Sequence, residues 1–199
     1  MRNRTAIALF LAPLLGCFVQ VENPNLALTQ SLCSGGSNCV PGFGAPLNLI
    51  QVNGQNSFTV DFGDQPLLKP SSDLGPAKLN SSLLLNGGAF DMRTAGADFS
   101  GVSSINVLAA LQPPSTPGAD PCQPASNCTV IATYNSATDG AANQHLALKG
   151  NGSDLLTFIN ATTHQLILQI QAQGTAPSPP AWNADVSMDM ALTSRAKFP

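Results

Sequence analysis

The chain has 199 residues, of which only 10% are charged, and its formal net charge at pH 7 is −3. This length suffices for one domain of moderate size whose core does not depend on disulfides. The few basic residues are scattered along the sequence, whereas a nucleic-acid surface needs clustered basic side chains that neutralise phosphates. We therefore expect no nucleic-acid partner.

The first seventeen residues predict an export signal. Arg2 and Arg4 precede an uncharged apolar run, Thr5–Leu15, which is followed by Gly16 and Cys17. A positive start, a short apolar core and a small residue before the cut are typical of a secretory signal peptide. The run is too short to span a bilayer, which needs about 20 residues. Residues 1–16 are therefore interpreted as a signal peptide.

The end of this segment, Leu14-Leu15-Gly16-Cys17, closely resembles the lipobox of bacterial lipoprotein precursors. The resemblance is confined to the signal region. It implies cleavage after Gly16, a diacylglyceryl thioether on the Cys17 sulfur and an acylated amino terminus, which together anchor the protein in a lipid bilayer. Phe18 is not the aspartate that often retains such proteins in the inner membrane, so the resemblance points to the outer membrane. The alternative is an ordinary cleaved signal that happens to contain a cysteine, and the protein would then be periplasmic or secreted.

Two regions are expected after the signal. Residues 17–31, which start at Cys17 and are largely polar, are predicted to form an unpaired tether behind the anchor. Residues 32–199 are predicted to form a single β-rich domain, because strand-like patterns continue on both sides of the proline-rich loop Gln112–Asn127. A division into two domains near Pro113–Pro121 is the alternative.

The composition favours strands over helices. Gly, Pro, Ser, Thr and Asn are abundant after the signal, whereas the good helix formers Glu, Lys and Arg are scarce. Apolar residues alternate with others at the period of a half-buried strand. The alternating runs are Phe58–Phe62, Ile105–Leu111, Leu166–Ala172, Val130/Ala132/Tyr134 against Thr129/Ile131/Thr133, and Val186/Met188/Met190/Leu192 against Ser187/Asp189/Ala191. These patterns predict an all-β fold, an antiparallel β-sandwich or flattened barrel of roughly eight to ten short strands with little helix.

Glycine and asparagine pairs mark the expected turns. Asn53-Gly54 is a favourable hairpin signal between two apolar runs. Asn86-Gly87-Gly88 is expected to join strands Leu83–Leu85 and Ala89–Met92. Gly150-Asn151-Gly152 is expected to join His145–Lys149 to a strand at Leu155–Ile159, and a short helix over Asp154–Ile159 is the alternative.

Four cysteines remain after Cys17, and they form two C-x5-C brackets that each end in Ser-Asn-Cys. Four cysteines allow three pairings. The local pairings Cys33–Cys39 and Cys122–Cys128 are favoured because each loop is rich in glycine or proline and can close on itself. Disulfides also suit the oxidising compartment that an exported chain meets. Zinc is the alternative, although the brackets lack the usual short ligand spacing. No metal and no other cofactor is therefore expected.

Catalytic signatures are scarce. The two histidines, His145 and His164, are interpreted as ordinary residues of strand surfaces or turns, and neither a G-x-S-x-G elbow nor an H-E-x-x-H motif occurs. Asp61 with Asp64, and Asp91 with Asp98, are possible paired carboxylates or calcium ligands, but nothing in the sequence distinguishes them from solvated loop acids. The sequence thus assigns no catalytic residue and leaves enzymatic activity undecided.

Two functions follow from these observations. The first is an envelope lipoprotein domain with a binding or structural role, whose partner is a glycan or an envelope protein. The second is a secreted hydrolase with a site built from Asp, Ser and His residues that the fold gathers. A histidine in a pocket, within hydrogen-bond reach of a carboxylate, would favour the second.

Overall fold

The computed structural model describes residues 18–33, 38–41, 46–47, 57–61, 78–112, 120–159, 165–177 and 181–197. These residues form an all-β fold, as predicted, with one four-residue helix and two short 3-10 turns. The elements are β1 (Phe18–Ser31), β2 (Val40–Pro41), β3 (Pro46–Leu47), β4 (Ser57–Asp61), β5 (Lys78–Met92), β6 (Val102–Ala110), η4 (Ala125–Asn127), β7 (Cys128–Asn135), α1 (Ser136–Asp139), β8 (His145–Gly150), η5 (Leu155–Thr157), β9 (Gln165–Thr175), β10 (Ala181–Trp182) and β11 (Ala184–Lys197).

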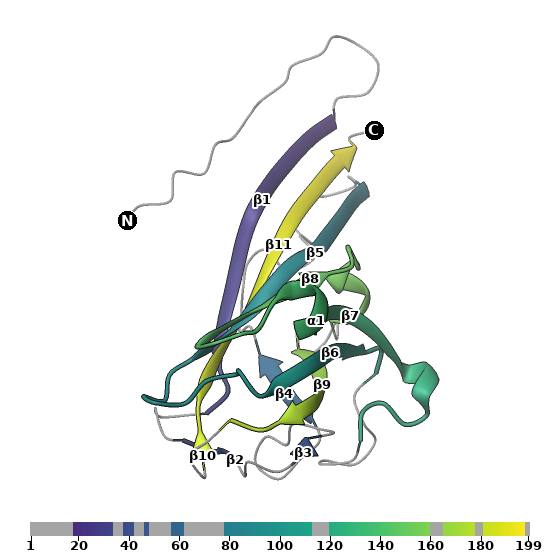
Figure 1. Cartoon of the computed structure of the whole chain (residues 1–199). Helices are drawn as coiled ribbons and strands as arrows, with labels where there is room; N and C mark the ends of the chain where they lie inside the picture. Colours follow the sequence, from purple (N-terminus) through teal and green to yellow (C-terminus); the bar gives the residue numbers. More distant parts are fainter. Residues whose placement is uncertain are drawn as a thin grey trace.

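One antiparallel sheet contains nine of the strands, in the order β1-β11-β5-β8-β7-β6-β9-β3, with β4 also paired to β9. This order is an open path and not a closed barrel. The long strands β1, β11 and β5 lie side by side on one part of the molecule, and β7, β6 and β9 lie across from them (Figure 1). A separate small sheet pairs β10 with β2.

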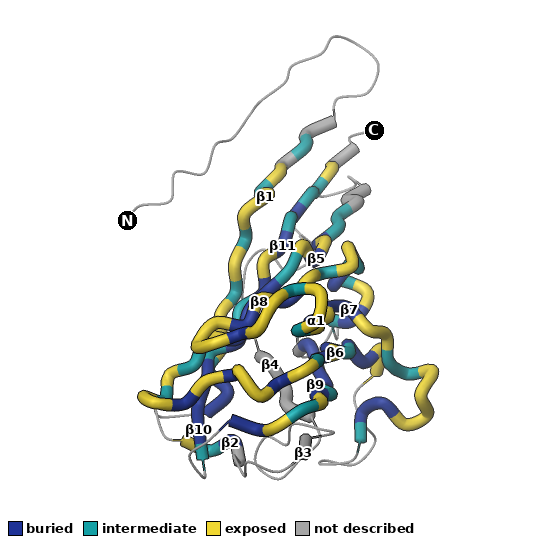
Figure 2. The backbone as a smooth tube through the Cα atoms, viewed as in Figure 1, coloured by how far each residue is buried: buried dark blue, intermediate teal, exposed yellow. Residues whose placement is uncertain are grey.

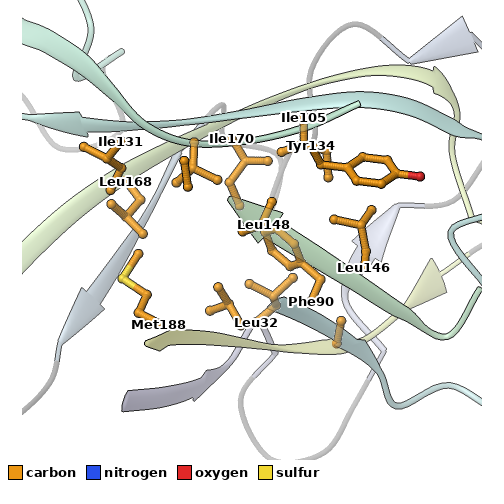
Figure 3. Close-up of a cluster of buried hydrophobic side chains, with 14 of the residues drawn as sticks. Leu32, Phe90, Ile105, Ile131, Tyr134, Leu146, Leu148, Leu168, Ile170 and Met188 are labelled. Atoms are coloured by element: carbon orange, nitrogen blue, oxygen red, sulfur yellow. The ribbon is translucent and has the colours of Figure 1, made fainter. Parts of the chain in front are cut away.

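The core lies between these two parts of the bent sheet, so the packing is that of a sandwich. Figure 3 shows Ile105, Ile131 and Ile170 on one side of the core, facing Phe90 and Met188 on the other. Two apolar layers that face each other remove their side chains from water together, and this burial is the main stabilising term of such a fold.

The alternation in the last long strand is confirmed. Val186, Met188, Met190 and Leu192 are buried, whereas Asp189 is exposed and Ser187 and Ala191 are partly exposed. Leu166, Leu168, Ile170 and Ala172 are likewise buried in β9. Figure 2 shows the buried residues concentrated where the two parts of the sheet overlap.

The predicted tether is wrong, because Phe18–Ser31 is strand β1 and not an unpaired segment. β1 pairs with β11 from Phe18 opposite Lys197 to Ser31 opposite Asp185. The register shifts between Asn23 and Leu26, so an irregularity at Pro24-Asn25 accommodates the proline whose missing N–H would otherwise interrupt the ladder. Leu26 and Leu28 pack against the core from this strand, which explains why the segment is paired.

The turn predicted at Asn86-Gly87-Gly88 is also wrong, because β5 continues through it. The register against β11 shifts there, from Gly87 opposite Asp189 to Leu85 opposite Met190. A Cβ on Gly88 would lie 2.4 Å from the Ser187 carbonyl oxygen, and a Cβ on Gly87 would lie 2.9 Å from that of Leu148. The glycines therefore permit close approach of neighbouring strands at a bulge.

Two smaller expectations need correction. Ile131 is fully buried and Val130 is exposed, the reverse of the prediction, because the register against β6 shifts between Leu108 and Val107 and reverses the alternation. After β8, Gly152 has φ +77° and continues the chain out of the strand as predicted, but the segment that follows is the 3-10 turn η5 and not a strand.

The three long strands project together beyond the rest of the sheet (Figure 1). β5 pairs with β8 only over Gly87–Asp91, and its first residues pair with β11 alone among the described strands. We call the part of β1, β11 and β5 from Phe18–Glu22, Thr193–Lys197 and Lys78–Ser82 the ribbon end. Between its strands, the hydroxyls of Ser81 and Ser194 lie 2.8 Å apart.

Candidate functional site

A row of charged side chains crosses the outer face of the sheet. Asp185 of β11 lies opposite Asp91 of β5, which lies opposite His145 of β8. Their neighbours along the strands, Phe90 and Leu146 among them, are buried in the core. Because successive side chains of a strand point to opposite faces, the charged row faces solvent.

Two polar contacts organise this row. His145 Nδ1 lies 2.6 Å from Asp91 Oδ1, and Arg93 Nε donates to Asp185 Oδ1 at 2.6 Å. The hydrogen bond to Asp185, and next the attraction of its charge, raise the pKa of Arg93 above its ordinary value. Arg93 is therefore charged at physiological pH.

A hydrolase would be favoured by a histidine that lies in a pocket and within hydrogen-bond reach of a carboxylate. The His145–Asp91 pair has the contact but not the pocket. The side chains are 62% and 52% exposed, so the pair is surrounded by water and lacks the low-dielectric surroundings that strengthen catalytic electrostatics. Within the described part of the chain, no serine, threonine or cysteine forms a hydrogen bond with His145, and all four described cysteines are disulfide-bonded. A nucleophile beside the base, which acyl transfer requires, is thus missing among these residues.

The other predicted carboxylates are not gathered around one ion. Asp98 Oδ1 accepts hydrogen bonds from the Ser100 amide and hydroxyl, whereas Asp91 contacts His145. The Ser100 hydroxyl and then its amide hold the pKa of Asp98 below its ordinary value. Among the described residues, no group of three or more metal-ligating side chains could hold a metal ion. His164, Asp64 and the side chain of Asp61 lie outside the description.

Both cysteine brackets are closed locally, as predicted. Cys33 and Cys39 are joined with Cα atoms 5.6 Å apart, and Cys122 and Cys128 with Cα atoms 5.1 Å apart. These four cysteines are therefore not zinc ligands. Two disulfides are typical of proteins in an oxidising compartment outside the cytoplasm.

Polar residues that sequence reasoning missed fix these brackets to the sheet. Buried Asn183 accepts a hydrogen bond from the Cys33 amide at 3.1 Å, and its own amide donates to Thr94 Oγ1 at 2.9 Å. In the second bracket, Asp120 Oδ1 accepts from the Cys122 amide at 2.8 Å and from Gln169 Nε2 at 2.7 Å. Gln169 occupies a polar position in the alternation of β9 and is nevertheless buried, so the sequence pattern gives no signal that distinguishes it from a solvent-facing residue.

Lys149 and Asp139 form a further ion pair, between β8 and α1. The hydrogen bond from Lys149, followed by that from the Asn135 amide, lowers the pKa of Asp139. Lys149 and Arg93 each form an ion pair with one aspartate. The positive charges of these two residues, which lie outside the ribbon end, are therefore locally neutralised.

No protein-family model matches the chain, and a search of curated proteins finds no significant match. None of the helices in the described ranges is long and apolar enough to cross a membrane.

Proposed function

We propose that the protein is an envelope lipoprotein, anchored in the outer membrane through acylated Cys17, with a binding or structural role. The observation that carries the proposal is the junction at residue 18. The lipobox-like Leu14–Cys17 is followed directly by a strand that pairs with β11 from Phe18 to Ser31, apart from the irregularity at Pro24-Asn25. Such a junction would couple the anchor rigidly to the domain, and the two disulfides suit an extracytoplasmic location.

The test is intact-mass analysis and membrane fractionation of the full chain and of Cys17→Ser. We expect acyl mass on the unmodified chain and its recovery in the detergent-extracted membrane fraction. The variant should lack that mass and leave the fraction. An acylated variant with unchanged fractionation would rule out this role for Cys17.

A binding role is favoured over catalysis by the outer face itself. The neighbouring row on this face, two residues along each strand, contains the small residues Thr29, Ser187 and Ala147. Thr29 and Ala147 are exposed, so a glycan or an envelope protein can reach the surface there. A photo-cross-linker at exposed Ala147 should capture a specific envelope component in cells. The same group at exposed Ala125, on the Cys122–Cys128 bracket, is the matched control. Equal capture at both positions would argue against the outer face as the binding surface.

The alternative, a secreted hydrolase, is favoured by one contact, the 2.6 Å approach of His145 to Asp91. If this pair were catalytic, His145→Ala would abolish hydrolysis of ester, amide or glycosidic substrates at constant stability. We expect no hydrolysis by the unmodified protein that this variant removes.

A further inference from the structure

The ribbon end brings together basic residues that are far apart in the sequence. Lys197 lies between Phe18 and Lys78 in one row across the three strands, and exposed Arg195 lies two residues back along β11. The ends of these strands lie together in Figure 1, away from β6, β7 and β9. The row of Phe18, Lys197 and Lys78 thus begins at the residue that directly follows Cys17.

The charge of the ribbon end is opposite in sign to that of the whole chain. After the predicted signal, the sequence has only six basic residues, and three of them are Lys78, Arg195 and Lys197. The acidic residue within the ribbon end is Glu22, whose side chain accepts a hydrogen bond from Gln20. The ribbon end is therefore net positive on a chain of net charge −3.

We propose that the ribbon end binds the anionic headgroups of the bilayer that holds the acyl chains of Cys17. This inference rests on the proposed function. One residue of extended chain spans at most about 3.6 Å and neighbouring strands lie about 4.8 Å apart, so the anchor lies roughly 6 Å from the backbone of Lys197 and roughly 10 Å from that of Lys78. These distances are comparable to the Debye length of about 8 Å at physiological ionic strength. Each basic residue near an anionic surface strengthens binding about fivefold.

This contact would also set the orientation of the molecule. β1 has 14 residues, and at about 3.3 Å per residue it extends for roughly 45 Å. With the ribbon end at the headgroups, the Cys33–Cys39 bracket, which follows the other end of β1, lies on the side directed away from the bilayer. The charged row of Asp185, Asp91 and His145 lies at that same distant end of the long strands.

The test uses the full acylated chain, reconstituted in phosphatidylcholine vesicles with and without phosphatidylglycerol. An amine-specific acetylating reagent is applied, and the modification rate of each lysine is read by mass spectrometry. We expect Lys78 and Lys197 to react several-fold more slowly in the anionic vesicles than in the neutral ones. Lys149, whose side chain is 69% exposed, should react at the same rate in both. High salt should remove the difference, because the Debye length falls to about 3 Å at 1 M.

A matched pair of variants separates local charge from total charge. Arg195→Gln should weaken the protection of Lys78 and Lys197 from acetylation in the anionic vesicles. Arg93→Gln removes the same charge from outside the ribbon end and should leave this protection unchanged. Equal effects of both variants would overturn the proposal.

The remaining outcomes distinguish the two proposals. Equal lysine rates in both vesicle types, with acyl mass on Cys17 in the same sample, would overturn headgroup binding and leave the lipoprotein assignment standing. If the chain carries no acyl mass, the proposed function fails. Flotation of that chain with phosphatidylglycerol vesicles then tests the ribbon end alone, and protein that does not float overturns it as well.

Discussion

The buried methionines of β11 show how one side chain can report the face of a strand. Met190 is 1% exposed, and its neighbour Asp189 is exposed on the other face. Met190→Ala should lower the free energy of unfolding by roughly 2–5 kcal/mol through lost burial and a residual cavity. Asp189→Ala should change it by no more than about 0.5 kcal/mol. Urea melts of the two variants compare them directly, and similar losses would contradict the assigned faces.

Asp98 provides a test of pH dependence at a single carboxyl. Its pKa is lowered by the Ser100 hydroxyl and amide, so its contribution to stability is present above the pKa of the unfolded chain. That contribution is lost as the pH falls through the lower folded value. Carbon-detected NMR titration should place the Asp98 pKa below its ordinary value, and Ser100→Ala should raise it toward that value. An unchanged titration in Ser100→Ala would show that the hydroxyl has no such effect.

At the scale of strands, the alternation of apolar residues was a good predictor of which face of a strand is buried. It was a poor predictor of where a bulge or a turn interrupts the strand. The buried set of Leu166, Leu168 and Ile170 follows directly from the pattern, because one face of the strand meets the core. The pattern at Ile131 failed because a bulge reverses the faces, and a bulge is fixed by the partner strand. The turn predicted at Asn86-Gly87-Gly88 was wrong because a close approach of two strands and a turn both require glycine. The sequence alone does not distinguish these two uses of glycine.

The Gly87-Gly88 bulge leads to a prediction about β5. Gly88→Ala should destabilise the protein by about 1–3 kcal/mol or more, because the new Cβ would meet the Ser187 carbonyl oxygen at 2.4 Å. Ser187→Ala, a change of side chain at the same contact, should stay within about 0.5 kcal/mol. Denaturant midpoints measure both. A Gly88→Ala protein as stable as the unmodified one would mean that the strands can separate there without cost.

At the scale of the whole molecule, what could not be predicted depends on pairings between distant segments. The contact between His145 and Asp91 joins residues 54 positions apart, and it depends on the register of β5 with β8. The ribbon end similarly gathers Lys78 and Lys197 from sequence positions that look scattered. Local patterns carry no information about which strands become neighbours, so the fold class was predictable while these juxtapositions were not.

β11 is the strand on which this arrangement depends, because it pairs with both β1 and β5. A chain that ends at Asp185 should show no cooperative unfolding transition, since β1 loses its only partner in the described sheet and the core loses Met188 and Met190. Removal of only Lys197–Pro199 should preserve the transition. Circular dichroism melts separate the two cases, and cooperative melting of the longer truncation would contradict the central place of β11.

The pairing of β1 with β11 also has a consequence for the order of events during synthesis. At about 5–20 residues per second, a nascent chain exposes its first strand for roughly ten seconds or longer before the matching strand exists. Contacts between such distant segments slow folding, because loop closure must precede them. During that interval the segment has open hydrogen-bonding groups on both sides, and Pro24, which has no N–H to donate, limits the length of strand that a wrong partner can match. Pro24 thus protects the chain most before the native sheet has formed.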